Sequence, residues 1–448
     1  MKLKTIWTVV LSALIAGAML TQANSARAGA VTKVLHRFTG GHDGAVPIGG
    51  LISDAAGNLY GTTTGGGDLS VCQQRGCGTV FELMPQSGGG WREKVLHNFN
   101  GRDGAGPYGT LIFDSSGNLY GTASEGGDPR YCTNYGCGVV FELLPTGNGK
   151  WKHKVLYFFK GTSSDGALPD SGLVFDTAGN LYGTTASGGL GGCLIGTCGV
   201  VFELTPTVGG KWSEKVLHRF RGGNDGGISY ATLILDKAGN LYGTTELGAT
   251  RFCRGDYGCG VVFELTPGPR GKWKETILHR FTGGKDGAGP GAGVIFDAQG
   301  NLYGTASWGG ALRYCDGNGC GVVFELSPRG NGKWDEKVLH SFTGGKDGST
   351  PVANLIFDAA GNLDGTASGG GNHVCYYLCG VAFRLTPSSG GAWQETVLHS
   401  FAERDGAYPE SSLTLDLAGN LFGTTIWGGD LNACSYYPGC GVVFEIMP

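Results

Sequence analysis

The sequence predicts an all-β protein, a seven-bladed β-propeller with four antiparallel strands per blade and an N-terminal strand that completes the last blade. Three observations lead to this prediction. A repeat of about sixty residues occurs seven times along the chain. Each copy holds four short segments with the composition of β-strands. The two ends of the chain carry complementary parts of one copy, as a closed ring requires.

The repeat is clearest in the segment Gly-Asn-Leu-Tyr-Gly-Thr. Five copies carry it unchanged, a sixth has Asp364 in place of Tyr, and the seventh has Phe422 there. Successive copies are separated by 58 to 62 residues, and the segment begins at Gly57, Gly117, Gly179, Gly239, Gly300, Gly361 and Gly419. A fixed period of this length is typical of propellers and solenoids.

Four segments of each copy, named A to D in chain order, are rich in Val, Ile, Leu, Phe and Tyr. In the third copy they are residues 173–176, 180–184, 200–204 and 212–220. Gly, Pro and Asn bound them, and none has the spacing of an amphipathic helix. The 87 glycines fall mainly at these boundaries, where tight turns need them. We expect strand A beside a central channel and strand D outermost.

The ends of the chain distinguish a ring from an open solenoid. Residues 31–38 match strand D but lack the Trp that starts every other copy of it. The last copy stops after its strand C, at 442–447. The first strand can therefore supply the missing fourth strand, which removes the exposed edges of a linear stack.

The first 28 residues have the layout of a secretory signal peptide. A basic start is followed by an apolar run from Thr5 to Leu20 and an Ala-x-Ala site ending at Ala28. The apolar run is too short to favour the alternative of a membrane anchor. We predict a signal peptide at 1–28 and one propeller domain at 29–448, with no membrane span after cleavage. The mature chain keeps 30 basic against 37 acidic residues, a net charge of about −7, which excludes nucleic acid as an expected partner.

The segments Gly-Asn-Leu-Tyr-Gly-Thr, Val-Phe-Glu-Leu-Thr-Pro and Val-Leu-His-x-Phe recur in this order through residues 31–448. In these segments the chain resembles the GloVer-type tandem repeat of secreted bacterial proteins, the choice-of-anchor repeat family. The resemblance implies export, repeats and anchoring signals that vary between members, but no catalytic residues. This chain shows no C-terminal anchor, so we expect a secreted or periplasmic bacterial protein.

Cysteines occur as one close pair in each copy. Two pairs would have to meet to give zinc its four ligands, and blades separate them, whereas export favours oxidation. We predict seven local disulfides, which join Cys72 to Cys77, Cys132 to Cys137, Cys193 to Cys198, Cys253 to Cys259, Cys315 to Cys320, Cys375 to Cys379, and Cys434 to Cys440.

Residues that differ between copies are the candidates for function, because a residue present in every copy is most simply part of the scaffold. The loops between strands B and C are expected on one face with the Asp-Gly loops between D and A, and binding residues concentrate on such loops. Aromatic and Arg side chains are common anchors there. The predicted ligand-binding residues are Trp308, Trp427, Tyr131, Tyr135, Arg251, Tyr257, Arg313, Tyr314, Tyr376, Tyr377, Tyr436 and Tyr437. The alternative is that these rings pack over the disulfides and between loops.

Three functions remain open. The first is a non-catalytic extracellular binding module for a polysaccharide or a surface protein. The second is a carbohydrate-active enzyme, which needs paired carboxylates at the loop face or channel mouth; the candidates are Asp68, Glu125, Asp128, Glu246, Asp256, Asp316 and Asp430. The third is a structural scaffold of the cell envelope.

No cofactor is expected. Calcium is the cation that stays open, at the Asp of the seven Asp-Gly pairs, because Asp and turn carbonyls are oxygen ligands. The favoured interpretation of these aspartates is a bond to their own turn. They are Asp43, Asp103, Asp165, Asp225, Asp286, Asp347 and Asp405.

Overall fold

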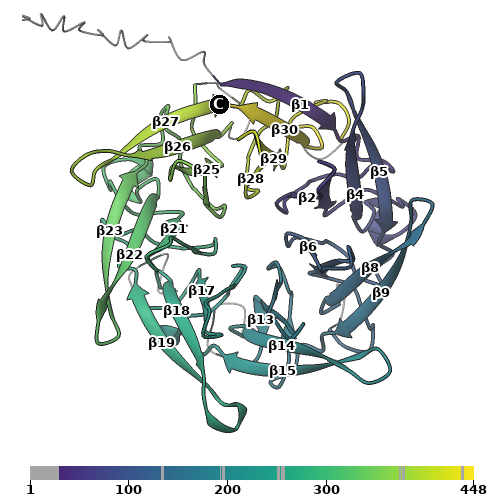
Figure 1. The fold of residues 1–448 in the computed structure, drawn as a ribbon, viewed down its shortest axis with the longest axis horizontal. Helices are drawn as coiled ribbons and strands as arrows, with labels where there is room; N and C mark the ends of the chain where they lie inside the picture. The colour runs from purple at the N-terminus through teal and green to yellow at the C-terminus, as the bar shows by residue number, and fades with distance from the viewer. Residues whose placement is uncertain are drawn as a thin grey trace, which may run out of the picture.

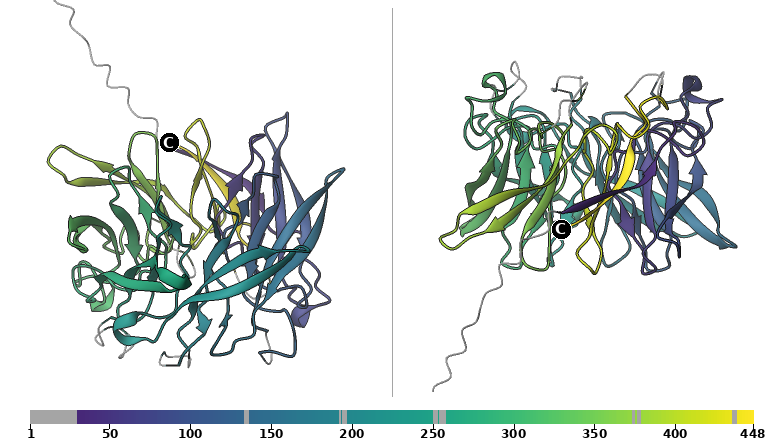
Figure 2. Two further views of the ribbon diagram at one scale, coloured as in Figure 1. Left: turned by 60° about the horizontal axis from the view of Figure 1, so that its bottom comes forward. Right: turned by 90° about the horizontal axis from the view of Figure 1, so that it is seen from above.

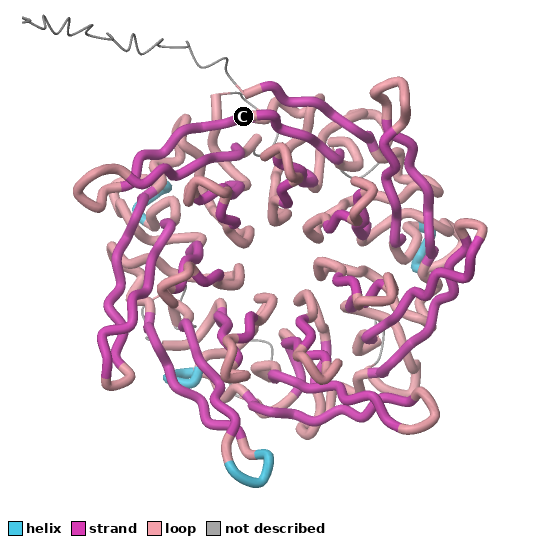
Figure 3. The backbone as a smooth tube through the Cα atoms, in the orientation of Figure 1, coloured by secondary structure: helices cyan, strands magenta, loops and turns pink. Residues whose placement is uncertain are grey.

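The computed structural model describes residues 30–448 except 133–135, 192, 194–196, 250–252, 254–257, 373–374, 376–378 and 435–437. Seven four-stranded antiparallel sheets stand around a common axis (Figure 1). In each sheet strand A is innermost and strand D outermost, and the short inner strands surround the centre (Figure 3). The predicted seven-bladed propeller is confirmed.

The two inner strands of each blade are short. The A strands are β2 (Ile52–Ser53), β6 (Ile112–Phe113), β11 (Val174–Phe175), β16 (Ile234–Leu235), β20 (Ile295–Phe296), β24 (Ile356–Phe357) and β28 (Thr414–Leu415). The B strands are β3 (Leu59–Thr63), β7 (Leu119–Ala123), β12 (Leu181–Thr184), β17 (Leu241–Thr245), β21 (Leu302–Ala306), β25 (Leu363–Ala367) and β29 (Leu421–Thr425).

The two outer strands are longer. The C strands are β4 (Thr79–Pro85), β8 (Val139–Gly147), β14 (Val200–Thr207), β18 (Val261–Pro267), β22 (Val322–Gly330), β26 (Val381–Pro387) and β30 (Val442–Met447). The D strands are β5 (Trp91–Asn98), β9 (Lys150–Phe158), β15 (Lys211–Arg219), β19 (Trp273–Arg280), β23 (Lys333–Ser341), β27 (Trp393–Ser400) and β1 (Val31–Arg37). Strands β10 (Gly166–Ala167) and β13 (Ser187–Gly188) form a separate two-stranded sheet that is not part of a four-stranded blade.

Helical structure in the described residues is limited to four single-turn 3₁₀ helices, η1 (Cys72–Gln74), η2 (Gly223–Asp225), η3 (Pro269–Gly271) and η4 (Cys315–Gly317). None of them is long and apolar enough to cross a bilayer.

The ring closes through its two ends. Strand β1 pairs antiparallel with β30, from Val31 opposite Met447 to Arg37 opposite Val442. The N-terminal strand thus completes the seventh blade beside the C-terminus (Figure 1). The predicted closure is confirmed, and the outer edge of β30 is covered.

The repeated Asp, Asn and Tyr form one hydrogen-bond network in each of five blades. In the first blade the Asp54 carboxylate accepts bonds from the Asn58 amide N–H at 2.9 Å, from Asn58 Nδ2 at 2.8 Å and from the Tyr60 hydroxyl at 3.1 Å. The Tyr60 hydroxyl also lies 3.0 Å from Glu82 Oε1 on strand C. The network turns the chain tightly between A and B, which is why these residues recur.

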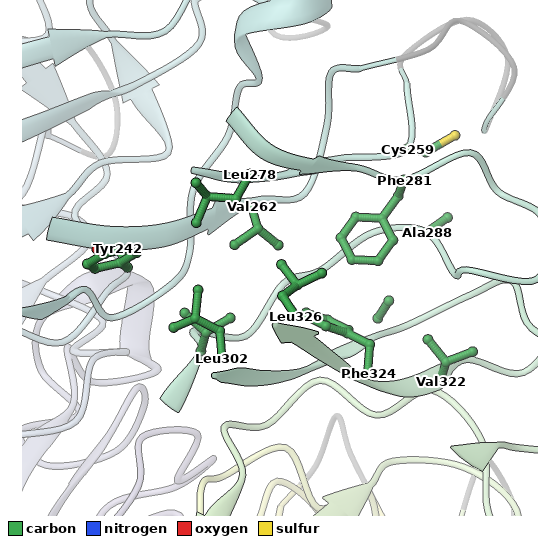
Figure 4. Close-up of a cluster of buried hydrophobic side chains, with 12 residues drawn as sticks. Tyr242, Cys259, Val262, Leu278, Phe281, Ala288, Leu302, Val322, Phe324 and Leu326 are labelled. Carbon is green, nitrogen blue, oxygen red and sulfur yellow. The ribbon is translucent and has the colours of Figure 1, made fainter. Parts of the chain in front are cut away.

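The hydrophobic core lies between neighbouring blades. Phe281, at the end of one blade, meets Phe324 of the next edge-to-face with ring centroids 5.2 Å apart, and both are fully buried (Figure 4). Glycine in strand B makes this packing possible: a Cβ at Gly61 would lie 2.6 Å from the Phe81 ring. This glycine recurs in every copy because the Phe side chain lies so close to the backbone of strand B.

All fourteen cysteines form the seven predicted disulfides, one per blade. Their Cα atoms are 5.1 to 5.4 Å apart, within the normal range for a disulfide. No pair approaches another to form a zinc site among the described residues. The bonds are typical of proteins that fold in an oxidising compartment.

Candidate functional site

The Asp-Gly loops and the cysteine loops lie together along one rim of the ring (Figure 2). A short antiparallel bridge joins each Asp-Gly loop to the residues just after strand B of its own blade, as between Ala288 and Trp308. The prediction that both sets of loops share a face is confirmed.

One position of every Asp-Gly loop has a left-handed backbone, with φ between 56° and 66°. Only two of the seven residues are glycine; they are Val46, Gly106, Leu168, Ile228, Gly289, Thr350 and Tyr408. β-Branched residues avoid this conformation, so the surrounding structure must impose it.

Hydrogen bonds to the preceding blade and within the loop's own blade impose that conformation. The Ile228 N–H donates to the Cys198 carbonyl of the preceding blade at 2.9 Å, and the Ile228 carbonyl accepts from the Glu246 N–H at 2.9 Å. Strand B adds a further link, because the Thr244 hydroxyl donates to the Ala292 carbonyl of the next blade at 2.6 Å. The loops around the axis are therefore a rigid platform.

These loops surround an axial pocket of about 630 Å³. The residue two places after each left-handed position faces this pocket, so all seven blades contribute to its wall. These seven residues are Ile48, Tyr108, Asp170, Tyr230, Gly291, Val352 and Glu410. The position differs in nearly every copy although its backbone is the same, and such a volume is normal for a small-molecule site.

Four carboxylates line the pocket, at Glu125, Asp170, Glu246 and Glu410, and among the residues that the structure describes none of the lining is Lys, Arg or His. Burial raises the pKa of Asp170 to about 6; a hydrogen bond from Ser124 opposes this rise and the nearby Glu125 carboxylate adds to it. Burial also raises the pKa of Glu125.

On the opposite part of the wall, burial raises the pKa of Glu410 to about 7, against the effect of its hydrogen bond with Tyr408. Burial and the charges of Glu246 and Asp170 raise the pKa of Tyr230. The pocket is therefore acidic, with two carboxyl groups that are partly protonated near neutral pH. Shifted pKa values in a cleft mark a functional site.

Aromatic rings also line the pocket or pack behind its wall. Trp308 is half-buried and packs on Gly289, where a Cβ would lie 2.7 Å from the indole. Trp427 stacks on Tyr408 with ring centroids 4.6 Å apart, so Tyr408 rather than Trp427 lines the pocket. Tyr108 and Tyr230 are 40% and 41% exposed at the rim, an accessibility that permits contact with a ligand.

Three other predicted ligand-binding residues lie outside the pocket. The Tyr131 and Tyr314 rings pack against the buried clusters that contain the disulfides of their own loops. Exposed Arg313 lies over Tyr314, with its guanidinium carbon 4.8 Å from the ring centroid. Seven more, Tyr135, Arg251, Tyr257, Tyr376, Tyr377, Tyr436 and Tyr437, lie outside the described residues.

The carboxylates considered for catalysis divide into two groups. Glu125 and Glu246 line the pocket, whereas Asp68 and Asp128 bond to Ser70 and Arg130 within exposed cysteine loops. Asp316 lies in η4 and Asp430 accepts from the Asn432 N–H, and neither lines the pocket. Asp256 lies outside the described residues. Sequence reasoning missed Asp170 and Glu410, although a signal was present: the position five residues after each Asp of Asp-Gly changes from copy to copy.

The seven aspartates considered for calcium bond to their own loops. Asp286 accepts from the Thr282 N–H at 2.9 Å and from the Thr282 hydroxyl at 2.5 Å, and also lies 3.4 Å from His279 Nε2. The Asp in each of the other six copies accepts a backbone N–H in the same way. Holding the turn accounts for their recurrence.

Two solved structures illustrate what the chain is similar to. A protein of unknown function from Dyadobacter fermentans DSM 18053 is 11% identical, with a TM-score of 0.44 over 94% of this chain and 100% of that one. The PQQ-bound aldose sugar dehydrogenase of Streptomyces coelicolor is 13% identical, with a TM-score of 0.40 over 93% of this chain and 98% of that one. A comparison with curated protein sequences finds no match.

The model of one repeat family matches the chain three times in overlapping segments, at residues 20–193, 69–252 and 250–448. Together the segments include every copy of the repeat. The chain therefore belongs to the Gloeobacter/Verrucomicrobia repeat family.

Proposed function

We propose that the protein is an exported binding module whose axial pocket takes a neutral or amino sugar, free or at the end of a glycan. The observation that carries the proposal is the pocket wall, in which one position per blade supplies a different side chain on an otherwise repeated and rigid platform. If these side chains only stabilised the ring, the same residue could serve in every blade. Binding of a ligand without sevenfold symmetry instead requires different side chains in different blades.

The chemistry of the wall supports a sugar. Ionised carboxylates accept strong hydrogen bonds from hydroxyl and ammonium groups, and Glu125, Asp170, Glu246 and Glu410 offer such acceptors. The half-buried Trp308 ring offers a flat apolar face for the C–H face of a pyranose. The described lining carries four carboxylates and no basic side chain, so we expect it to repel uronic and sulfated sugars.

The predicted export and the disulfides support a function outside the cytoplasm. The predicted signal peptide at 1–28 and seven disulfide-linked loops fit a protein that works outside the cytoplasm, where free glycans occur.

Binding is tested with residues 29–448 on an array of neutral, amino and acidic oligosaccharides, followed by calorimetry on the best ligand. We expect Trp308→Ala to weaken binding at least tenfold. Because the ring is partly buried against the core between blades, the free energy of unfolding also falls, by about 2 kcal/mol, and binding is compared under conditions in which both proteins are folded. Arg313→Ala, on the same blade but outside the pocket, is the matched control and retains full affinity. Failure of every neutral and amino sugar to bind, or equal affinity of Trp308→Ala and wild type, contradicts the proposal.

A second candidate, glycoside hydrolysis, is favoured by the pKa values of about 6 for Asp170 and about 7 for Glu410. A glycosidase needs one carboxylic acid that stays protonated and one ionised carboxylate. Asp170→Asn and Glu410→Gln are assayed on chromogenic glycosides. The protein is an enzyme if the wild type hydrolyses a glycoside and either variant loses this activity but keeps its affinity for the sugar. If the wild type binds sugar without hydrolysing it, the binding module is the function that remains.

A further inference from the structure

A second type of polar cluster lies at the joints between blades, away from the axial pocket. At such a joint the His near the end of strand D and the Asp of the following Asp-Gly loop meet a strand D residue of the next blade. At one joint His218 Nε2 lies 3.4 Å from Asp225 Oδ2 and 3.5 Å from Glu275 Oε1. The next blade supplies Glu at five joints, through Glu93, Glu214, Glu275, Glu336 and Glu395. At the Glu214 joint Tyr157 takes the place of the His.

The joint between the first and second blades is different, because His153 stands where those five joints have Glu. The His153 and His97 rings are parallel, with an angle of 6° between planes and centroids 4.0 Å apart. His97 Nε2 lies 3.2 Å from Asp103 Oδ2. One ligand atom from each of the three residues lies within 4.8 Å of the other two.

Both imidazole Nε2 atoms are buried at this joint, and neither makes a hydrogen bond of good geometry to the part of the chain that the structure describes. The same holds for Nε2 of His218, His279 and His340 at Glu joints, so this joint differs in bringing two such atoms together. A buried polar atom without a partner needs an explanation, such as a bound ion. At a Glu joint the carboxyl group can carry its own proton and donate it to the Asp. A neutral imidazole at that place can carry its proton on Nδ1, and the lone pair of its Nε2 is then free to bind a metal ion.

The surroundings hold the three groups close together, and the parallel rings must rotate before both in-plane Nε2 lone pairs meet at one ion. The Asp103 carboxylate accepts from the Asn100 N–H at 2.9 Å and from Asn100 Nδ2 at 3.0 Å. The His97 and His153 rings both stand edge-to-face on Phe99, with centroids 4.8 and 5.7 Å away. Apolar packing and outer hydrogen bonds of this kind orient the ligands of metal sites.

We propose that His97, Asp103 and His153 bind one divalent transition metal ion, such as Zn²⁺, at the joint between the first two blades. Two imidazoles and one carboxylate are a ligand set that zinc accepts, with the fourth position left to water. Calcium is disfavoured because it takes six to eight oxygen ligands. The ion links strands β5 and β9 across the core and adds a stabilising cross-link between blades.

The test uses untagged protein treated with a chelator and titrated with ZnCl2 by calorimetry, with bound zinc counted by elemental analysis. We expect one zinc per chain and a higher unfolding temperature on binding. Co²⁺ at the same site gives visible absorption bands of a four-coordinate ion. His97→Gln and His153→Gln lower the affinity at least tenfold and remove those bands.

His340→Gln, at a joint that has Glu395 instead of a second His, is the matched control and leaves zinc affinity and stoichiometry unchanged. His153→Glu installs the residue of the five other joints, so it folds even if the Gln variants do not, and it also loses the Co²⁺ bands. Absence of zinc binding, or unchanged zinc binding by His153→Glu, overturns the proposal. Loss of an equivalent zinc in His340→Gln overturns the assignment to a two-His joint.

Discussion

Arg384 and Asp364 form a buried two-point ion pair in the sixth blade, with Nε 2.7 Å from Oδ1 and Nη2 2.8 Å from Oδ2. Asp364 is fully buried and Arg384 is 7% exposed. They occupy the positions of Tyr and Glu in most blades, directly opposite each other on β25 and β26. Arg384 also lies 3.4 Å from Asp358. The residues equivalent to Asp358 accept the Tyr hydroxyl in five other blades.

The first prediction concerns this exchange of two residues. Arg384→Leu leaves the Asp364 charge buried without its partner, and we expect a loss of about 3–5 kcal/mol in the free energy of unfolding. The double variant Asp364→Tyr, Arg384→Glu restores the pair found in other blades and should come within about 1 kcal/mol of wild type. Urea unfolding measures both. Additive losses in the double variant contradict a coupled pair.

The second prediction concerns ring closure. Removing residues 29–38 deletes β1 and leaves the outer edge of β30 unpaired. An open edge promotes association with other chains, so we expect oligomers or aggregates by light scattering and a lower unfolding temperature. A chain that starts at residue 30 retains all of β1 and serves as the control. A monomeric, equally stable truncated protein would show that closure does not depend on this strand.

The third prediction concerns the disulfides. Denatured, unreduced protein should contain no reactive thiols, and reduced protein fourteen. Replacing Cys315 and Cys320 by Ser opens one short loop and should lower the free energy of unfolding by about 2 kcal/mol, because the unfolded chain gains entropy. Urea unfolding measures the loss. A change near zero would mean that the loop's own packing, including Tyr314, holds it in place.

The fourth prediction concerns pH. Folding raises the pKa of Asp170 from 3.8 to about 6 and that of Glu410 from 4.5 to about 7. The folded state therefore binds more protons than the unfolded state between about pH 4 and pH 7. The stabilisation from these two groups is complete below pH 4 and is lost as the pH rises through 6 and 7.

Unfolding in urea at pH 5 and pH 8 measures this effect against the double variant Asp170→Asn, Glu410→Gln. Neither replacement titrates, so we expect the variant to lose less stability than wild type between the two pH values. An identical loss in both proteins would assign the pH dependence to other groups.

The sequence predicted the framework of the candidate site better than its chemistry. Comparison of copies identified Trp308, Glu125 and Glu246 because each departs from its repeat just after strand B. It missed Tyr108, Asp170, Tyr230 and Glu410, which follow the Asp-Gly pairs at a position with no residue in common. Trp427 departs from its repeat in the same way as Trp308, yet the Tyr408 ring stacks on it and separates it from the pocket.

The sequence by itself determined the ring, the disulfides and the order of strands, because these follow from local pattern and period. Strand composition, turn residues and cysteine spacing act over a few residues, and seven repetitions reinforce each signal. Only the tertiary structure decided which side chains face the axis and that His153 lies against His97, 56 residues earlier in the chain. Contacts between blades join positions about one repeat apart, and closure of the ring, not local sequence, sets their distance and burial.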